Sequence, residues 1–317
     1  MTDATAGERF DYDEFGLFHE NIAEFDLDVD ELPPVERVAG PAADDPERSV
    51  SALRFGATAP KVVFVHGGAQ NAHTWDTVIL ALGEPALAVD LPGHGHSEWR
   101  DDGGYTPRNM ADDVAAAIRR HAAPPVHLVG MSLGGLTSMM VAAHHPDLVA
   151  SLTMVDITPG VNAEKTKAIT DFIDGPQSFA SFDDLLARTQ EHNPTRSESS
   201  LRRGILHNAH QLDDGSWQWR YDRSSHSRAA GSGSEATSDD ERVARLSGLW
   251  DDFAAVPARV MVVRGSLSPV VDDDDVAEAR RRRPAVTIEV VDGAGHSIQG
   301  DRPVELAGLL ADWWDRG

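Results

Sequence analysis

Short apolar runs recur along the chain, and glycine or proline follows each of them closely. An early segment, residues 48–55, alternates apolar and polar positions in the manner of a strand. The later runs are four to six residues long and rich in β-branched side chains, which is typical of strands buried on both faces of a parallel sheet. They occupy residues 62–65, 86–90, 126–129, 152–155, 260–263 and 286–291.

Helical patterns lie between these runs, most clearly at residues 109–121 and 135–145. Alternation of strand with helix predicts a mostly parallel α/β sheet flanked by helices. Residues 160–255 interrupt the alternation with polar helical patterns, the pair Trp217 and Trp219, and a low-complexity stretch at 224–240. That stretch is typical of a flexible loop.

The interruption suggests three parts. We expect an acidic surface extension at residues 1–34, a core domain formed by 35–159 and 256–317, and a cap at 160–255 that covers one end of the sheet. The two tryptophans of the cap are candidates either for substrate contact or for packing within the cap.

Composition narrows the class of protein. The 317 residues include 41% hydrophobic residues, enough for a full core, but no apolar run approaches the length of a membrane span. The chain has 52 acidic and 28 basic residues, and a net charge of −24 disfavours nucleic acid and anionic lipid as partners. Cysteine is absent, which excludes disulfides and thiolate chemistry. The acidic N-terminus lacks a hydrophobic signal region, so we expect a cytoplasmic protein; monomer and homo-oligomer stay equally open.

The first chemical signal is the sequence at residues 130–134, which has the form G-x-S-x-G and connects a predicted strand to a predicted helix. A nucleophilic serine needs a sharp turn of this kind so that its hydroxyl projects from the sheet, and side chains on the flanking residues would clash there. Ser132 is therefore the predicted nucleophile.

Two other glycine-rich segments supply the groups that a serine nucleophile needs. A tetrahedral oxyanion requires two backbone N–H donors, and those of Leu133, next to the nucleophile, and Gly68, after the strand 62–65, suit this role. His296 lies in a glycine-rich loop after the last predicted strand, and we expect it to take the proton of Ser132.

These motifs together resemble the α/β-hydrolase superfamily: HGG at 66–68, DLPGHGHS at 90–97, GMSLGG at 130–135 and GAGHS at 293–297 appear in the family's order. The resemblance covers residues 48–158 and 257–315. It implies an eight-stranded, mostly parallel sheet with a cap inserted after the sixth strand. It also implies that Ser132 is the nucleophile, His296 the base, and the N–H groups of Gly68 and Leu133 the oxyanion hole.

The chain departs from that family at the acid that orients the histidine. Most members carry it after the seventh strand as Gly-x-x-Asp, but here Ser268 stands at that position, and the next carboxylates, 272–275, look like a solvated helix start. Haloalkane dehalogenases and zearalenone-type lactone hydrolases place the acid after the sixth strand instead, where this chain has Asp156. We therefore predict Asp156 as the acid; a structural carboxylate is the alternative.

A serine nucleophile argues against dehalogenase and epoxide hydrolase activity, which use aspartate in this fold. The predicted function is hydrolysis of a small apolar carboxylic ester or lactone, including macrocyclic lactones, through an acyl-enzyme, with no cofactor and no metal. Two alternatives stay open. One is a carbon–carbon bond hydrolase of diketones, which Ser297 after His296 disfavours because those enzymes usually have an aromatic residue there. The other is a non-catalytic ligand-binding member of the fold.

Overall fold

The computed structural model describes residues 11–223 and 248–316 of the chain. The predicted flexible loop at residues 224–240 lies outside these ranges.

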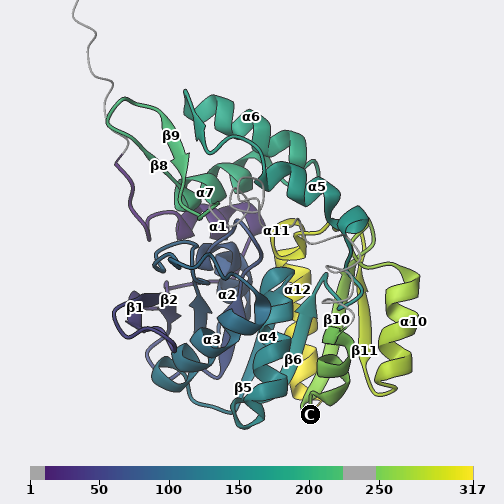
Figure 1. The fold of residues 1–317 in the computed structure, drawn as a ribbon. Helices are drawn as coiled ribbons and strands as arrows, with labels where there is room; N and C mark the ends of the chain where they lie inside the picture. Colours follow the sequence, from purple (N-terminus) through teal and green to yellow (C-terminus); the bar gives the residue numbers. More distant parts are fainter. Residues whose placement is uncertain (1–10, 224–247, 317) are drawn as a thin grey trace, which may run out of the picture.

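An eight-stranded sheet forms the centre of the molecule (Figure 1). From edge to edge its strands are β1 (Val35–Pro41), β2 (Ser49–Phe55), β4 (Ala86–Val89), β3 (Val62–Val65), β5 (Val126–Met131), β6 (Val149–Val155), β10 (Arg259–Gly265) and β11 (Thr287–Val291). The six strands from β4 to β11 run parallel, while β2 pairs antiparallel with both β1 and β4. The predicted fold class is confirmed, and every predicted strand lies in this sheet.

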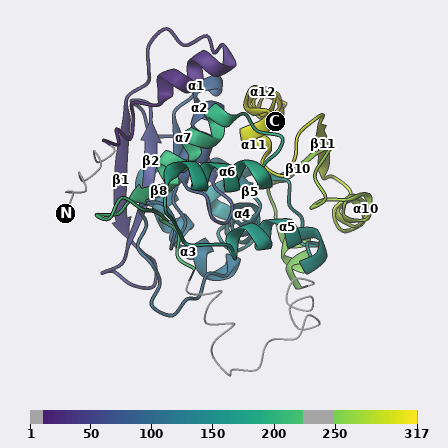
Figure 2. The ribbon, with the colours of Figure 1, turned by 90° about the horizontal axis from the view of Figure 1, so that it is seen from above.

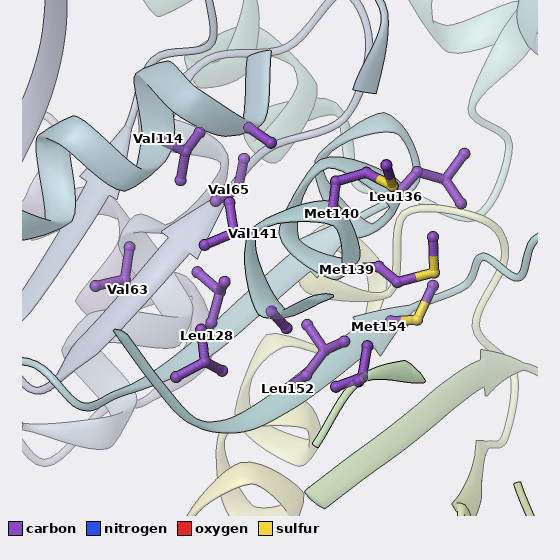
Figure 3. Close-up of a cluster of buried hydrophobic side chains, with 14 of the residues drawn as sticks. Val63, Val65, Val114, Leu128, Leu136, Met139, Met140, Val141, Leu152 and Met154 are labelled. Carbon is purple, nitrogen blue, oxygen red and sulfur yellow. The ribbon is translucent and has the colours of Figure 1, made fainter. Parts of the chain in front are cut away.

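Helices cover both faces of the sheet. One face carries α3 (Pro107–His121), α4 (Leu133–His144), α10 (Asp273–Arg282) and the short 3₁₀ turn η2 (Pro146–Leu148). The other carries α1 (Phe18–Phe25), η1 (Ala72–Trp75), α2 (Asp76–Leu82), α11 (Ile298–Asp301) and α12 (Pro303–Asp315). Figure 3 shows part of the hydrophobic core on the face that carries α3 and α4, where side chains of α4 meet those of β3, β5 and β6.

The continuous apolar run of β3 follows from this layering. Successive strand residues point to opposite faces, so Val63 and Val65 enter the core under α3 and α4, and Val62 and Phe64 enter the core under α2. All four side chains are buried, and a polar residue at any of them would lose its contact with water.

A second layer lies over one end of the sheet, at the top of Figure 1. It contains α5 (Ala163–Ile173), β7 (Ser178–Phe179), α6 (Phe182–His192), α7 (Glu198–Asn208), β8 (Ala209–Gln211) and β9 (Trp217–Trp219). The three strands form a separate antiparallel sheet in the order β7-β9-β8. Seen from above in Figure 2, α5, α6 and α7 lie across the large sheet. All these elements fall between residues 160 and 255, the segment expected to form a cap.

The N-terminal segment differs from the expected surface extension. Phe18 of α1 is only 2% exposed and packs against Phe55, with 5.7 Å between ring centroids. Glu20 and Glu24 of the same helix pair with Arg202 and Arg203 of α7. α1 therefore joins the core to the second layer. No local pattern in this acidic stretch indicated that contact. The edge strand β1 was also not predicted, because its side chains are only partly buried and its apolar pattern is weak.

Among the residues that the structure describes, no helix has the length and apolarity needed to cross a membrane.

Candidate active site

Ser132 occupies the turn between β5 and α4 with an unusual backbone. Its φ of 51° and ψ of −120° lie outside the regions that side chains normally favour. The glycines around it allow the turn: a Cβ on Gly130 would overlap the carbonyl oxygen of Gly134, and one on Gly134 would overlap the carbonyl oxygen of His66. The turn thus requires glycine at both flanking positions and leaves Ser132 facing a cavity.

The loop after β3 brings Gly68 next to this turn. A Cβ on Gly68 would lie 3.9 Å from Leu133 Cδ2, so the two predicted N–H donors belong to neighbouring residues in space. The peptide that joins Gly67 to Gly68 is held by His66, whose Nδ1 lies 2.7 Å from the Gly67 carbonyl oxygen. Since His66 Nε2 accepts a hydrogen bond from the N–H of Leu91 at 2.9 Å, Nδ1 must carry the ring proton and donate it to that carbonyl.

Burial keeps this histidine neutral. His66 is 0% exposed, and desolvation together with nearby His94 lowers the pKa of His66 to about 3. A neutral ring with a fixed tautomer turns the Gly67 carbonyl toward His66, so the Gly68 N–H in the same planar peptide points the opposite way. His66 therefore has an orienting role that the sequence analysis did not assign.

His296 and Asp156 meet at the carboxyl ends of the strands. His296 Nδ1 lies 2.7 Å from Asp156 Oδ2, within the hydrogen-bond range. The Asp156 side chain is fully buried, while that of His296 is 16% exposed. A buried carboxylate at this distance selects the tautomer with a proton on Nδ1, which leaves Nε2 free to accept a proton.

Two donors from the loop after β10 hold Asp156 from the other side. The N–H of Gly265 donates to Asp156 Oδ1 at 3.0 Å, and the hydroxyl of Ser268 donates to Asp156 Oδ2. Asp156 itself has a left-handed φ of 49°, and its N–H donates to the carbonyl of Val263 in β10 at 2.7 Å. The carboxylate is thus fixed by backbone pairing and by three donors to its two oxygens.

The four carboxylates at 272–275 lie at the start of α10. Asp272 caps the start of α10, and its side chain and that of Asp275 bond each other's backbone N–H groups in a capping box. The expectation of a solvated helix start is correct for the exposed Asp272 but wrong for Asp275, which is 4% exposed and pairs with Lys165 at 2.6 Å. The pairing with Lys165 of α5 explains its burial.

Gly68, Ser132 and His296 line one cavity of about 340 Å³ between the large sheet and the second layer. The second layer contributes apolar lining through the side chains of Ile169, Phe172, Ile173 and Trp219. Trp219 lines the cavity, whereas Trp217 packs within the second layer against Phe182, with ring centroids 5.0 Å apart. Trp219 also packs within this layer, against Tyr221 with ring centroids 5.7 Å apart, so packing describes both tryptophans and substrate contact stays a prediction for Trp219.

A second titratable cluster also lines this cavity. His73, Asp76 and His207 are buried, and their ligand atoms lie within 4.8 Å of one another, close enough for a metal to be considered. The rings of His73 and His207 stack with centroids 3.8 Å apart and planes 8° apart, so their lone pairs point along parallel planes and do not converge on one ion. The donor geometry therefore does not suit a tetrahedral metal site.

Hydrogen bonds account for this cluster instead. His73 Nδ1 lies 2.8 Å from Asp76 Oδ2, and His207 Nδ1 lies 2.6 Å from the hydroxyl of Tyr12. Burial has the largest effect and lowers the pKa of His73, but the charge of Asp76 and the hydrogen bonds to Asp76 and Glu14 together outweigh burial and raise the pKa of His73 to about 9. Sequence spacing could not reveal this group, because its members come from the N-terminal segment, η1, α2 and α7.

Comparisons with known proteins show the family of this chain. A family model described as alpha/beta hydrolase fold matches residues 60–303. The chain is 45% identical over 305 residues to esterase Rv0045c of Mycobacterium tuberculosis, covering 94% of each chain. It is 30% identical over 254 residues to 2-(acetamidomethylene)succinate hydrolase of Mesorhizobium japonicum, covering 79% of this chain and 86% of the relative. A solved structure of the M. tuberculosis esterase matches with a TM-score of 0.81 and 43% identity over 96% of this chain and 100% of that one.

Proposed function

This chain belongs to the α/β-hydrolase fold family, and we propose that it is a serine hydrolase that cleaves carboxylic esters through an acyl-enzyme on Ser132. The observation that carries the proposal is the hydrogen bond between the buried Asp156 and His296. His296 and the strained Ser132 border the same cavity, so a substrate bound there would meet both residues. The similarity to an esterase over nearly the whole chain supports the same reaction class.

In the proposed first half-reaction, Ser132 Oγ attacks the ester carbonyl carbon while His296 Nε2 takes the hydroxyl proton. The carbonyl oxygen becomes an oxyanion that accepts hydrogen bonds from the N–H groups of Gly68 and Leu133. The carbon–oxygen bond to the leaving alcohol then breaks, and His296 returns the proton to that alcohol. Asp156 stabilises the positive charge that His296 carries between these two transfers.

In the second half-reaction water replaces the alcohol. His296 removes a proton from water, the hydroxide attacks the acyl carbon, and the bond to Ser132 Oγ breaks as His296 reprotonates that oxygen. The products are a carboxylic acid and free enzyme. A lactone follows the same steps, except that its leaving hydroxyl stays attached to the acyl chain.

The cavity suggests the size of the substrate. A volume of about 340 Å³ suits a compact ester, and the wall of Ile169, Phe172, Ile173 and Trp219 favours an apolar portion next to the ester group. We propose that this wall belongs to a cap formed by residues 160–255 and that the cap selects among esters and lactones. The core at 35–159 and 256–317 would then supply the chemistry.

The test combines labelling with turnover. Wild-type protein should bind a fluorophosphonate covalently at Ser132 and hydrolyse p-nitrophenyl esters of short acids, and Ser132→Ala should lose both activities while keeping its circular dichroism spectrum. Removal of the nucleophile from a serine protease costs on the order of a million-fold in kcat. A folded Ser132→Ala protein with activity within tenfold of wild type would refute the proposal.

A further inference from the structure

The cavity at Ser132 is lined by polar residues as well as apolar ones. Four of the polar residues carry a buried side-chain atom that has no hydrogen-bond partner among the described residues: Asp76 Oδ1, Arg196 Nε, His207 Nε2 and Gln299 Oε1. Native proteins leave few buried polar atoms unpaired, and a cluster of them in one cavity indicates that a polar ligand or water completes it. Arg196 is the strongest recognition group of the four, because a guanidinium presents several donors in a fixed plane.

The loop between α6 and α7 holds Arg196 close to the catalytic histidine. The preceding residue, Thr195, donates from its hydroxyl to Asp301 Oδ2 at 3.0 Å. A Cβ on Gly300, four residues after His296, would lie 2.7 Å from Arg196 Nε, so the guanidinium lies directly against the backbone there. Arg196 Nη2 donates to Ser200 Oγ at 2.7 Å in the first turn of α7, which fixes one side of the guanidinium.

Charge balance distinguishes Arg196 from the other cations that line the cavity. Lys165 pairs with Asp275, and Arg203 pairs with Glu24. Within the described ranges, no carboxylate lies within 4.0 Å of Arg196; its hydrogen bonds go to Ser200. Burial lowers the pKa of Arg196, and the more distant charges of Asp301 and Glu24 offset only part of that effect. A partly desolvated cation without a direct counter-ion is costly, and an anion from the ligand would reduce that cost.

We propose that Arg196 binds a carboxylate of the substrate, so that the preferred esters carry a free carboxylate at the far end of the acyl chain. This inference rests on the proposed esterase function and adds a substrate class to it. A singly charged carboxylate fits better than a doubly charged phosphate, because Asp76 also lines the cavity and the chain as a whole carries a net charge of −24. A planar carboxylate also matches the fork of the guanidinium, which a lysine ammonium would not.

The experiment compares two esters with the same leaving group, p-nitrophenyl hexanoate and the mono-p-nitrophenyl ester of adipic acid, which adds a terminal carboxylate. The ratio of their kcat/KM values is measured in wild type, Arg196→Met and Arg196→Lys. Arg202→Met is the control, because Arg202 lies on α7 and is 40% exposed at the surface. We expect Arg196→Met to lower the acid-to-neutral ratio by at least about tenfold, with Arg196→Lys intermediate and Arg202→Met unchanged.

The outcomes separate this inference from the proposed function. Absence of both fluorophosphonate labelling and neutral-ester turnover in wild type would overturn the esterase itself. Neutral-ester turnover with the same ratio in wild type and Arg196→Met would overturn only the role of Arg196. Inhibition by free adipate and by inorganic phosphate tests the anion without any variant: competitive inhibition by adipate alone is expected. Inhibition by neither, or equally by both, contradicts carboxylate recognition.

Discussion

The ends of β6 and β10 are adjacent in the sheet and differ in one chemical respect. The two strands run parallel and pair through Val155 and Val263, so their following loops leave the same edge side by side. The loop after β6 begins with the carboxylate of Asp156, and the loop after β10 carries the hydroxyl of Ser268. Most members of the superfamily that the sequence resembles carry the carboxylate in the second loop.

In the proposed mechanism the histidine needs a carboxylate at one point in space and not at one point in the chain. His296 Nδ1 and the hydroxyl of Ser268 both contact Asp156 Oδ2, so the two loops converge on a single oxygen atom. In the proposed mechanism Asp156 supplies the charge, and Ser268 acts as a positioning residue that orients this charge. The sequence analysis assigned Ser268 no role.

The largest expected effect comes from removing the charge after β6. Asp156→Asn keeps the size of the side chain but cannot stabilise a protonated His296. Loss of the acid in a serine protease costs about 10⁴-fold in kcat, and we expect a loss of at least about 100-fold here. Steady-state ester hydrolysis by the folded variant measures it. Activity within fivefold of wild type would remove Asp156 from the mechanism.

The comparison predicts that the charge can be moved from one loop to the other. In the double variant Asp156→Asn/Ser268→Asp, the new carboxylate starts from a residue whose side chain already reaches the Asp156 oxygen nearest His296. We expect the double variant to recover at least about tenfold in kcat over Asp156→Asn. If the double variant is no faster than the single one, the loop after β10 does not direct its side chain at the histidine.

A smaller effect is expected from the hydroxyl alone. Ser268→Ala removes a donor to a charged acceptor, a hydrogen bond worth about 1.5–3 kcal/mol, and part of that loss should appear as a drop in kcat of about three- to tenfold. Ser268→Thr, which keeps the hydroxyl, should restore kcat.

Ser266 provides the matched control for that variant. Its hydroxyl lies in the same loop but donates to Asp292 Oδ1 at 3.1 Å. Ser266→Ala should therefore leave kcat unchanged. Equal effects of the two alanine variants would mean that Ser268 contributes only to the structure of the loop.

The smallest effects should come from the acids that follow in the same loop. Asp274 is exposed, and Asp272 caps α10, where asparagine caps almost as well. Asp272→Asn and Asp274→Asn should each lower kcat by less than about fivefold and leave the unfolding temperature nearly unchanged. A loss larger than that of Asp156→Asn would place the catalytic acid after β10.

The site separates into parts that local patterns reveal and parts that they do not. The Ser132 turn could be predicted, because its glycines are required by close contacts within and next to the turn itself. The donor role of Ser268 and the orienting role of His66 could not, since each depends on a partner that sequence spacing does not reveal. Arg196 belongs to no motif, and only the folded chain places it against Gly300.

The sequence by itself determined the family and the order of strands and helices, since a strand such as β3, buried on both faces, must be apolar at every position. Tertiary structure alone decided that Phe18 enters the core, that Glu20 and Glu24 join α1 to α7, and that the loops after β6 and β10 meet at one oxygen of Asp156. The physical reason is the range of the interactions. Burial periodicity and turn sterics act over a few residues and leave a local pattern, whereas hydrogen bonds and ion pairs between distant segments form only after the chain has folded.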